Sequence, residues 1–285
     1  MRTLTLALMM IVGLTVTAFA QQEPVWHRSG ETTKLETQLF RSGQAFSLPT
    51  AETLQKHNLQ FEISHRFYPP VQESQNLFGL GGPAKIRLGL GFALSDRLLV
   101  MAAVSNIDNN LDYSFKYRLP TVIRGNVPVV MALQGGLGWN TNVYGRTRGD
   151  SRNFQYYGQL AVNTMLKKRL GLGVVPSVLY NSIVADSSKS EHAVVIGAYA
   201  EYYVNSVLGV LAEWSRVVDG TRRQYQTGAF GIELNTGGHF FKILLTNSIY
   251  LNPTQYLAGS DDQFNGNKLR LGFTITRLFS FNHPK

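Results

Sequence analysis

Apolar and polar residues alternate strictly along residues 111–119, L-D-Y-S-F-K-Y-R-L. The odd positions are all apolar or aromatic, and the even positions are all polar. Successive side chains of a β-strand point to opposite faces, so this period of two predicts a strand with one apolar and one polar face. Such a strand fits a soluble sheet that covers a core, and it also fits a transmembrane barrel whose apolar face meets lipid.

Similar alternation recurs along most of the chain and predicts about twelve strands. These strands are residues 56–67, 84–94, 98–105, 110–119, 128–139, 152–166, 170–180, 192–203, 206–217, 224–234, 239–250 and 268–279. Most of them are ten to fifteen residues long, whereas strands of soluble domains usually have about 5–6 residues. A tilted strand needs about 9–11 residues to cross a bilayer, so the lengths favour a membrane barrel over a soluble sandwich.

The connections between these strands alternate in length, as in barrels that have long extracellular loops and short periplasmic turns. Two connections break the rhythm: residues 106–109 are short where a long loop is expected, and residues 120–127 are longer than a tight turn. An even number of strands returns the C-terminus to the side of the N-terminus. We therefore predict an all-β, up-and-down antiparallel transmembrane β-barrel of about twelve strands over residues 56–281, followed by a tail at 282–285.

The N-terminal residues 1–20 have the features of a secretory signal peptide. Arg2 precedes an apolar run at residues 4–16, and A-F-A at residues 18–20 is a cleavage site. Residues 21–55 are polar and irregular, so we expect a periplasmic lead-in or a partial plug there. The chain has no cysteine, which excludes a disulfide framework and thiolate chemistry.

Composition adds support for the barrel and argues against nucleic-acid binding. The chain has 27 glycines, 13 tyrosines and 16 phenylalanines, which suit tight turns and the aromatic girdles of membrane barrels. Its formal net charge is +9, or +8 without Arg2, but the basic residues are dispersed. The longest basic run is residues 167–169, in a predicted turn, so no basic patch for nucleic acid is present.

Charged residues concentrate on the predicted inner face of the strands. The lumen-lining candidates are Glu62, Arg66, Lys85, Arg87, Asp112, Lys116, Arg118, Glu201, Lys242, Lys268 and Arg270. The pattern places Glu213 and Glu233 on this face less clearly. Because basic residues outnumber acidic ones, a small channel or binding barrel that favours small anionic solutes is one interpretation. The alternative is a closed structural or partner-docking barrel whose lumen charges pair with one another.

No constellation for catalysis or for metal binding stands out. Ser64 and His65 are adjacent strand residues, so their side chains point to opposite faces and cannot form a dyad. His192 and His239 begin strands at opposite ends of the predicted barrel, and G-x-S-x-G is absent. The six histidines are dispersed, so we predict no metal site, no cofactor and no enzymatic activity. An outer-membrane lipid or envelope hydrolase is the less favoured alternative.

Three stretches resemble a known family. They are F-E-I-S-H-R-F at residues 61–67, N-L-F-G-L-G-G-P-A-K-I-R-L-G-L-G-F-A-L-S-D-R-L-L-V at residues 76–100, and F-K-Y-R-L at residues 115–119. Together they resemble uncharacterised outer-membrane β-barrel proteins of Bacteroidota-type bacteria, a domain of unknown function. The resemblance covers about residues 45–279. It implies location in the cell outer membrane and implies no activity.

The expected partners follow from this location. They are outer-membrane lipid and lipopolysaccharide, the barrel-assembly machinery during insertion, and a small anionic solute. No nucleic acid is expected.

Overall fold

A computed structural model describes residues 38–124, 127–184 and 191–281. The predicted signal peptide, the first part of the predicted lead-in and the C-terminal tail lie outside these described residues. No helix in the described ranges is long and apolar enough to cross a membrane.

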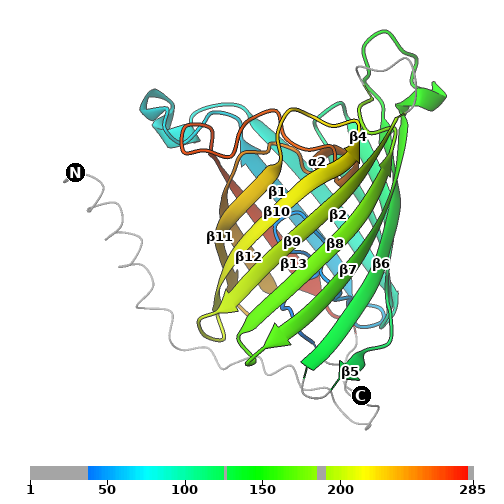
Figure 1. Cartoon of the computed structure of the whole chain (residues 1–285), viewed down its shortest axis with the longest axis vertical. Coiled ribbons are helices and arrows are strands. Elements are labelled where there is room, and N and C mark those ends of the chain that lie inside the picture. The colour runs from blue at the N-terminus through cyan, green and yellow to red at the C-terminus, as the bar shows by residue number, and fades with distance from the viewer. Residues whose placement is uncertain (1–37, 125–126, 185–190, 282–285) are drawn as a thin grey trace. The chain divides into compact units, whose positions relative to one another are not determined.

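Twelve of the strands form one closed antiparallel ring (Figure 1). The strands are β1 (Leu59–Phe67), β2 (Ala84–Ser95), β3 (Leu98–Ser105), β4 (Asn110–Arg118), β5 (Val122–Arg124), β6 (Val127–Asn140), β7 (Phe154–Leu166), β8 (Leu170–Tyr180), β9 (His192–Tyr203), β10 (Leu208–Gly220), β11 (Thr227–Asn235), β12 (His239–Thr246) and β13 (Arg270–Phe279). Neighbours in sequence pair with each other, β4 pairs with β6, and β13 pairs with β1 to close the ring. The predicted twelve-strand barrel is confirmed.

The two connections that break the loop rhythm have simple structural causes. The β3–β4 link is a tight hairpin turn in which Asp108 and Asn109 both have a positive φ, a conformation that aspartate and asparagine tolerate well. The β4–β6 link contains β5, which pairs only with the first residues of β6. β5 therefore lengthens one hairpin without adding a strand to the ring. This hairpin lies at the end of the barrel where β1 begins and β13 ends, here called the terminal end.

Side chains alternate between a polar interior and an apolar exterior. On β2, Ile86, Leu88 and Leu90 are exposed on the outside, whereas Arg87 and Gly89 are buried on the inside. The opening stretch of the sequence behaves in the same way as β4, because its aromatic positions face outward and its charged positions are buried. An exposed apolar surface of this extent requires a lipid environment.

Two segments outside the ring fill its interior. Residues 38–52, here called the lumen segment, precede β1, and residues 247–260, here called the cap segment, follow β12. The cap segment contains the short helix α2 (Pro253–Tyr256), and both segments are largely buried. Two short 3-10 helices, η1 (Ser74–Gly79) and η2 (Ser151–Asn153), lie in the long loops. These loops are at the end of the barrel where β1 ends and β13 begins, here called the loop end.

Candidate functional site in the barrel lumen

The lumen segment is folded into a tight turn that gathers its backbone N–H groups at one point. Gln44 and Pro49 form an isolated antiparallel bridge, and Ala45 N donates to Leu48 O at 2.8 Å. Thr50 N donates to the carbonyl of Gly43 at 3.1 Å and closes the base of the turn. The backbone N–H groups of Phe46, Ser47 and Leu48 are not used within the turn and point toward the barrel wall.

Glu213 of β10 receives three of these N–H groups. Its Oε2 accepts hydrogen bonds from the backbone N–H of Phe46 at 2.9 Å, Ser47 at 2.9 Å and Leu48 at 3.0 Å. The Glu213 side chain is buried, so its charge is stabilised mainly by these donors. The arrangement resembles an anion-binding nest, in which successive N–H groups converge on one negative group.

Lys242 of β12 binds the opposite pole of the same turn. Its Nζ donates to Ser42 Oγ at 2.8 Å, to the Ala45 carbonyl at 2.5 Å and to the Gln44 carbonyl. Glu233 Oε2 lies 3.3 Å from Lys242 Nζ and accepts from Ser42 Oγ at 2.7 Å. The turn is therefore held between a carboxylate that accepts from its backbone N–H groups and an ammonium that donates to its backbone carbonyls.

Glu52 ties the two ends of the lumen segment to each other and to the wall. Its Oε1 accepts from the N–H groups of Leu39 at 2.8 Å and Phe40 at 3.1 Å. Its Oε2 forms a buried ion pair with Arg118 of β4 at 2.6 Å. Lys116, also on β4, donates to the carbonyls of Gly43 and Glu52. Backbone and side-chain groups of the segment thus meet charged wall residues on four strands.

The wall is also shaped to receive the apolar side chains of the lumen segment. A Cβ built on Gly171 would lie 2.7 Å from Phe40 Cζ, and one built on Gly197 would lie 2.6 Å from Leu48 Cδ1. Any larger side chain at these two positions would displace Phe40 or Leu48. Tyr199 closes this area, because its ring meets the Phe40 ring edge-on at 5.3 Å.

The cap segment reaches the same interior from the loop end. Asn252 is fully buried, accepts from Arg87 Nε at 2.7 Å and donates to Asn110 Oδ1 at 2.5 Å. Gln255 Nε2 donates to the carbonyl of Ile107 at 3.0 Å. Tyr256 OH lies 3.4 Å from Gln159 Oε1. These contacts fix α2 against β4, β7 and the turn between β3 and β4.

One ion pair connects the lumen segment with the cap segment. Glu62 Oε2 accepts from Gln44 Nε2 of the lumen segment at 2.8 Å, and Glu62 Oε1 pairs with Arg87 Nη1 at 2.5 Å. Arg87 in turn donates to Asn252 of the cap segment. Gln44, Glu62, Arg87 and Asn252 therefore form a continuous chain of hydrogen bonds across the barrel.

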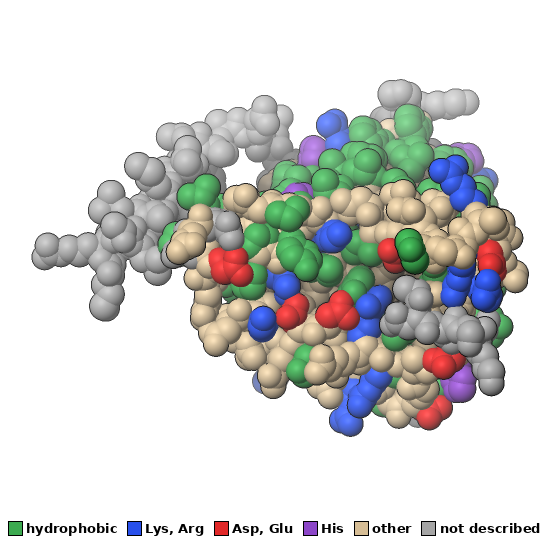
Figure 2. All heavy atoms as spheres, turned by 90° about the horizontal axis from the view of Figure 1, so that it is seen from above, with side chains coloured by type: hydrophobic (Ala, Val, Ile, Leu, Met, Phe, Trp, Pro, Cys, Tyr) green, Lys and Arg blue, Asp and Glu red, His purple; other side chains and the backbone are tan. Residues whose placement is uncertain are grey.

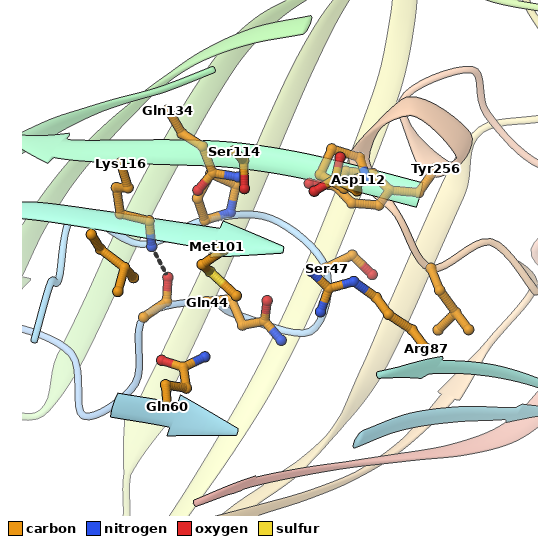
Figure 3. Close-up of a pocket in the computed structure, with 15 residues that line it drawn as sticks. Gln44, Ser47, Gln60, Arg87, Met101, Asp112, Ser114, Lys116, Gln134 and Tyr256 are labelled. Atoms are coloured by element: carbon orange, nitrogen blue, oxygen red, sulfur yellow. Dashed lines mark hydrogen bonds between the residues drawn. The ribbon is translucent and has the colours of Figure 1, made fainter. Parts of the chain in front are cut away.

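A small cavity with both polar and apolar lining residues lies between the two segments (Figure 3). Gln44 and Ser47 contribute to its lining from the lumen segment and Tyr256 from the cap segment, beside Arg87 and Asp112 of the wall. Its volume is about 30 Å³, which is room for roughly one or two water molecules. A solute of several heavy atoms does not fit this cavity.

The residues predicted to line the lumen fall into three groups. Those in contact with the lumen segment or the cap segment are Glu62, Arg87, Lys116, Arg118 and Lys242. Those buried elsewhere on the inner side are Arg66, Asp112, Glu201 and Arg270, with Arg270 paired to Asp262 at 2.7 Å. The remaining two are not buried: Lys85 is half-buried at the start of β2, and Lys268 is exposed before β13 begins.

The buried charges are balanced, in contrast to the basic excess predicted from the sequence. Among the described residues, the buried charged side chains are Glu52, Glu62, Asp112, Glu201, Glu213 and Glu233 on the acidic side and Arg66, Arg87, Lys116, Arg118, Lys242 and Arg270 on the basic side. Two predicted basic residues, Lys85 and Lys268, stay near solvent. Three acidic ones come from the lumen segment or from strands with less regular patterns. Burial favours this balance, because an unpaired charge in a dry interior is costly.

Sequence reasoning missed the wall-binding residues of the lumen segment. Ser42, Gln44 and Glu52 lie in a stretch without periodicity, so no pattern marked them as interior residues. One usable signal was present in the two wall glycines, because glycine inside a strand often marks a close approach by another backbone or side chain.

The serine and histidine candidates for catalysis are kept apart. Ser64 is buried and contacts Thr274 at 3.1 Å, whereas His65 stacks on Phe273 on the outer face with 4.9 Å between ring centroids. His192 lies 3.5 Å from the carboxylate of Asp219, at the loop end of β9. His239 opens β12 at the terminal end of the barrel.

The loop end of the barrel carries charges of both signs. Acidic and basic side chains are interspersed over this face in the view of Figure 2. Burial raises the pKa of the Asp108 carboxyl in the β3–β4 turn above its ordinary value, and the positive charges of Arg223 and Lys85 oppose that rise. Arg223 also pairs with Asp261 at 3.2 Å. The rim is thus a mixed surface without a field of one sign.

Comparisons with known proteins agree with the barrel architecture. The model of a family described as a membrane bound beta barrel domain (DUF5777) matches residues 40–279. Among solved structures, the NanC porin is similar at 12% identity and a TM-score of 0.45, covering 77% of this chain and 98% of that chain. An outer membrane channel from Pseudomonas putida F1 is similar at 13% identity and a TM-score of 0.49, covering 80% of this chain and 98% of that one.

A third similar structure is the outer membrane protein Omp33 of Acinetobacter baumannii, at 11% identity and a TM-score of 0.40, covering 79% of this chain and 99% of that one. The comparison with curated proteins found no match. The resemblance seen in the sequence is confirmed, and so is the predicted location in the outer membrane. Because the family model spans most of the chain and describes the fold observed, this outer-membrane protein belongs to the family of membrane bound beta barrel domains (DUF5777).

Proposed function

We propose that the protein is an outer-membrane channel for small polar solutes that its own lumen segment holds closed. In this proposal the lumen segment blocks the barrel from the terminal end, and the cap segment narrows it from the loop end. Displacement of the lumen segment opens a polar path. The observation that carries the proposal is the set of charged wall residues, Glu213, Lys242 and Arg118, that bind the segment.

The chemistry of these contacts supports a segment that can leave. Hydrogen bonds and ion pairs to wall residues can be replaced by water when the segment moves, and the buried side chains of Phe40, Phe46 and Leu48 form the apolar part of the interface that opposes release. A barrel of about 8 strands is filled by its wall side chains, and one of about 16–18 strands leaves a wide channel. Here a separate segment fills the space that the wall glycines Gly171 and Gly197 leave open.

The balanced interior argues for weak ion selectivity in the open state. Release of the lumen segment takes Glu52 out of the lumen and leaves six buried cations against five buried carboxylates on the wall, which are Arg66, Arg87, Lys116, Arg118, Lys242 and Arg270 against Glu62, Asp112, Glu201, Glu213 and Glu233. The anion preference expected from the sequence is therefore not part of this proposal. The proposal contains no catalytic step.

Replacing Gly197 by leucine tests the proposal without removing any charge. The new side chain occupies the space of Leu48 and is expected to push the lumen segment from the wall. In planar bilayers we expect rare, brief openings for the natural protein and frequent or lasting openings for Gly197→Leu. The matched control is Gly158→Leu, because Gly158 faces the apolar outside near Val178. Identical, silent recordings from all three proteins would contradict the channel proposal.

A permanently closed structural or partner-docking barrel is the second candidate. The six-to-six charge balance and the closure from both ends favour it. Removal of residues 38–52 distinguishes the two functions. A channel gains conductance when its blocking segment is deleted, whereas a structural barrel loses stability and stays silent. The thermal unfolding of the deletion variant in lipid vesicles provides the second measurement.

A further inference from the structure

The loop between β1 and β2, residues 68–83, exposes a cluster of apolar side chains at the loop end of the barrel. Leu77 is 66% exposed, Phe78 57% and Leu80 52%, and Tyr68 at the base of the loop is also exposed. All the other long loops lie at this end too, but this one extends sideways beyond the barrel wall, at the upper left of Figure 1. Its apolar tip therefore lies beside the wall and away from the lumen.

The backbone of this tip is in an unfavourable conformation. Leu77 and Phe78 both have a positive φ, of 50° and 56°. Two other consecutive pairs of non-glycine residues in the described part of the chain have positive φ, Asp108–Asn109 and Lys167–Lys168, and both consist of polar residues at strand turns. Left-handed backbone is costly for residues with a Cβ, so a large apolar pair in this state is unusual.

Backbone hydrogen bonds anchor the base of this loop. Tyr68 N donates to the carbonyl of Pro83 at 2.9 Å and closes the base of the loop. Val71 N donates to the carbonyl of Leu269 at 2.8 Å and fastens the loop to the chain that leads into β13. The loop is thus fastened at its base, while Leu77 and Phe78 stay exposed at its tip.

The loop that carries the apolar tip leads directly into the lipid-facing wall of the barrel. β2 begins directly after the loop, and its outward residues Ile86 and Leu88 are exposed on the barrel wall. Long loops of such barrels lie on the extracellular side, so the tip lies at the outer-leaflet end of the barrel. Apolar side chains that overhang a membrane surface gain free energy when they enter the boundary between headgroups and acyl chains.

We propose that residues 77–80 insert into the outer leaflet of the membrane and form a lipid contact beside the barrel. The occupant of this surface is the acyl region of the lipid, because the loop extends sideways from the lipid-facing barrel and carries no charged residue between Leu77 and Leu80. This inference is independent of the channel proposal, since it concerns the outside of the barrel.

Site-directed spin labelling tests this proposal cleanly, because the natural chain has no cysteine. Single cysteines replace Leu77, Phe78 or Leu80, and the labelled proteins are reconstituted in phosphatidylcholine–phosphatidylglycerol vesicles. Leu90→Cys on the exposed face of β2 is the lipid control, and Tyr144→Cys in another outer loop is the water control. Oxygen concentrates in the bilayer and a nickel chelate stays in water, so their relaxation effects report the depth of each label.

We expect the oxygen-to-nickel ratio at the three tip positions to exceed that of Tyr144→Cys by about tenfold, as for a group buried ~5–10 Å into the acyl boundary. Leu80→Cys lies outside the strained pair and keeps the test valid if the other two variants do not fold. A ratio equal to that of Tyr144→Cys at all three positions would overturn the proposal. Dipolar broadening between labels would instead identify a second copy as the occupant and would equally overturn it.

Discussion

Replacing Glu213 by alanine is expected to release the lumen segment from the barrel wall. One buried carboxylate oxygen accepts the backbone N–H groups of Phe46, Ser47 and Leu48 at 2.9–3.0 Å. Among the described residues, Glu213 is the acceptor for all three of these donors, and none of them has a second hydrogen-bond partner. Loss of the carboxylate therefore affects three backbone donors at once.

The expected magnitude follows from the cost of a buried donor without a partner. Each such donor costs about 1–3 kcal/mol, so three of them destabilise the closed arrangement by about 3–9 kcal/mol if nothing rearranges. Water and small movements reduce this figure, so the lower limit is the safer expectation. About 3 kcal/mol corresponds to a shift of roughly 150-fold from the closed toward the released state. Glu213→Gln keeps one acceptor oxygen and is expected to give a smaller shift.

Cysteine accessibility measures this shift directly. Ala45 is buried in the lumen segment, and the chain has no natural cysteine, so Ala45→Cys provides a unique probe. A membrane-impermeant maleimide should label it slowly in the natural background and much faster with Glu213→Ala. Asp219→Ala removes an exposed carboxylate and serves as the control for a general loss of charge. Equal labelling rates in all three backgrounds, with the barrel still folded by circular dichroism, would refute the assigned role of Glu213.

Two further predictions concern the ion pair that links the segments and the outer surface. Arg87→Met leaves the buried Glu62 carboxylate without its cation and should lower the free energy of unfolding in urea by about 3–5 kcal/mol. The double variant Arg87→Met, Glu62→Leu should recover most of this loss. A failure to recover would show that the broken ion pair is not the cause. Leu90→Arg, at an outward position of β2, should cost about 2–4 kcal/mol in lipid vesicles. Tyr144→Arg, in an exposed loop, should cost nothing, and equal costs would contradict the lipid-facing assignment.

Most of the barrel could be predicted from the alternation of residues along the chain. The period of two along residues 111–119 fixes which side chains share a face, and Tyr113, Phe115 and Tyr117 do face outward. Strand pairing in an up-and-down barrel follows chain order, so strand positions alone determine its topology. The extra strand β5 was missed, because three paired residues at the end of a hairpin leave no periodic pattern.

The contents of the lumen could be predicted only in part. Strand parity identified inward charges such as Glu62, Arg87 and Lys242, since parity is a local property. Their partners Gln44, Ser42 and Asn252 lie in irregular segments. Contacts between such segments and the wall depend on distances in space, which no periodicity encodes.

The closed β-architecture and the outward apolar surface could thus be predicted from residue order, because both depend on side-chain direction along a strand. The filled lumen and the balance of its charges became evident from the folded arrangement of the chain. Glu52 shows the reason: it belongs to no strand, yet its carboxylate lies 2.6 Å from Arg118 because the chain folds back into the barrel before β1 begins. A buried charge must find a partner within such a distance, and the fold as a whole determines which partner is available.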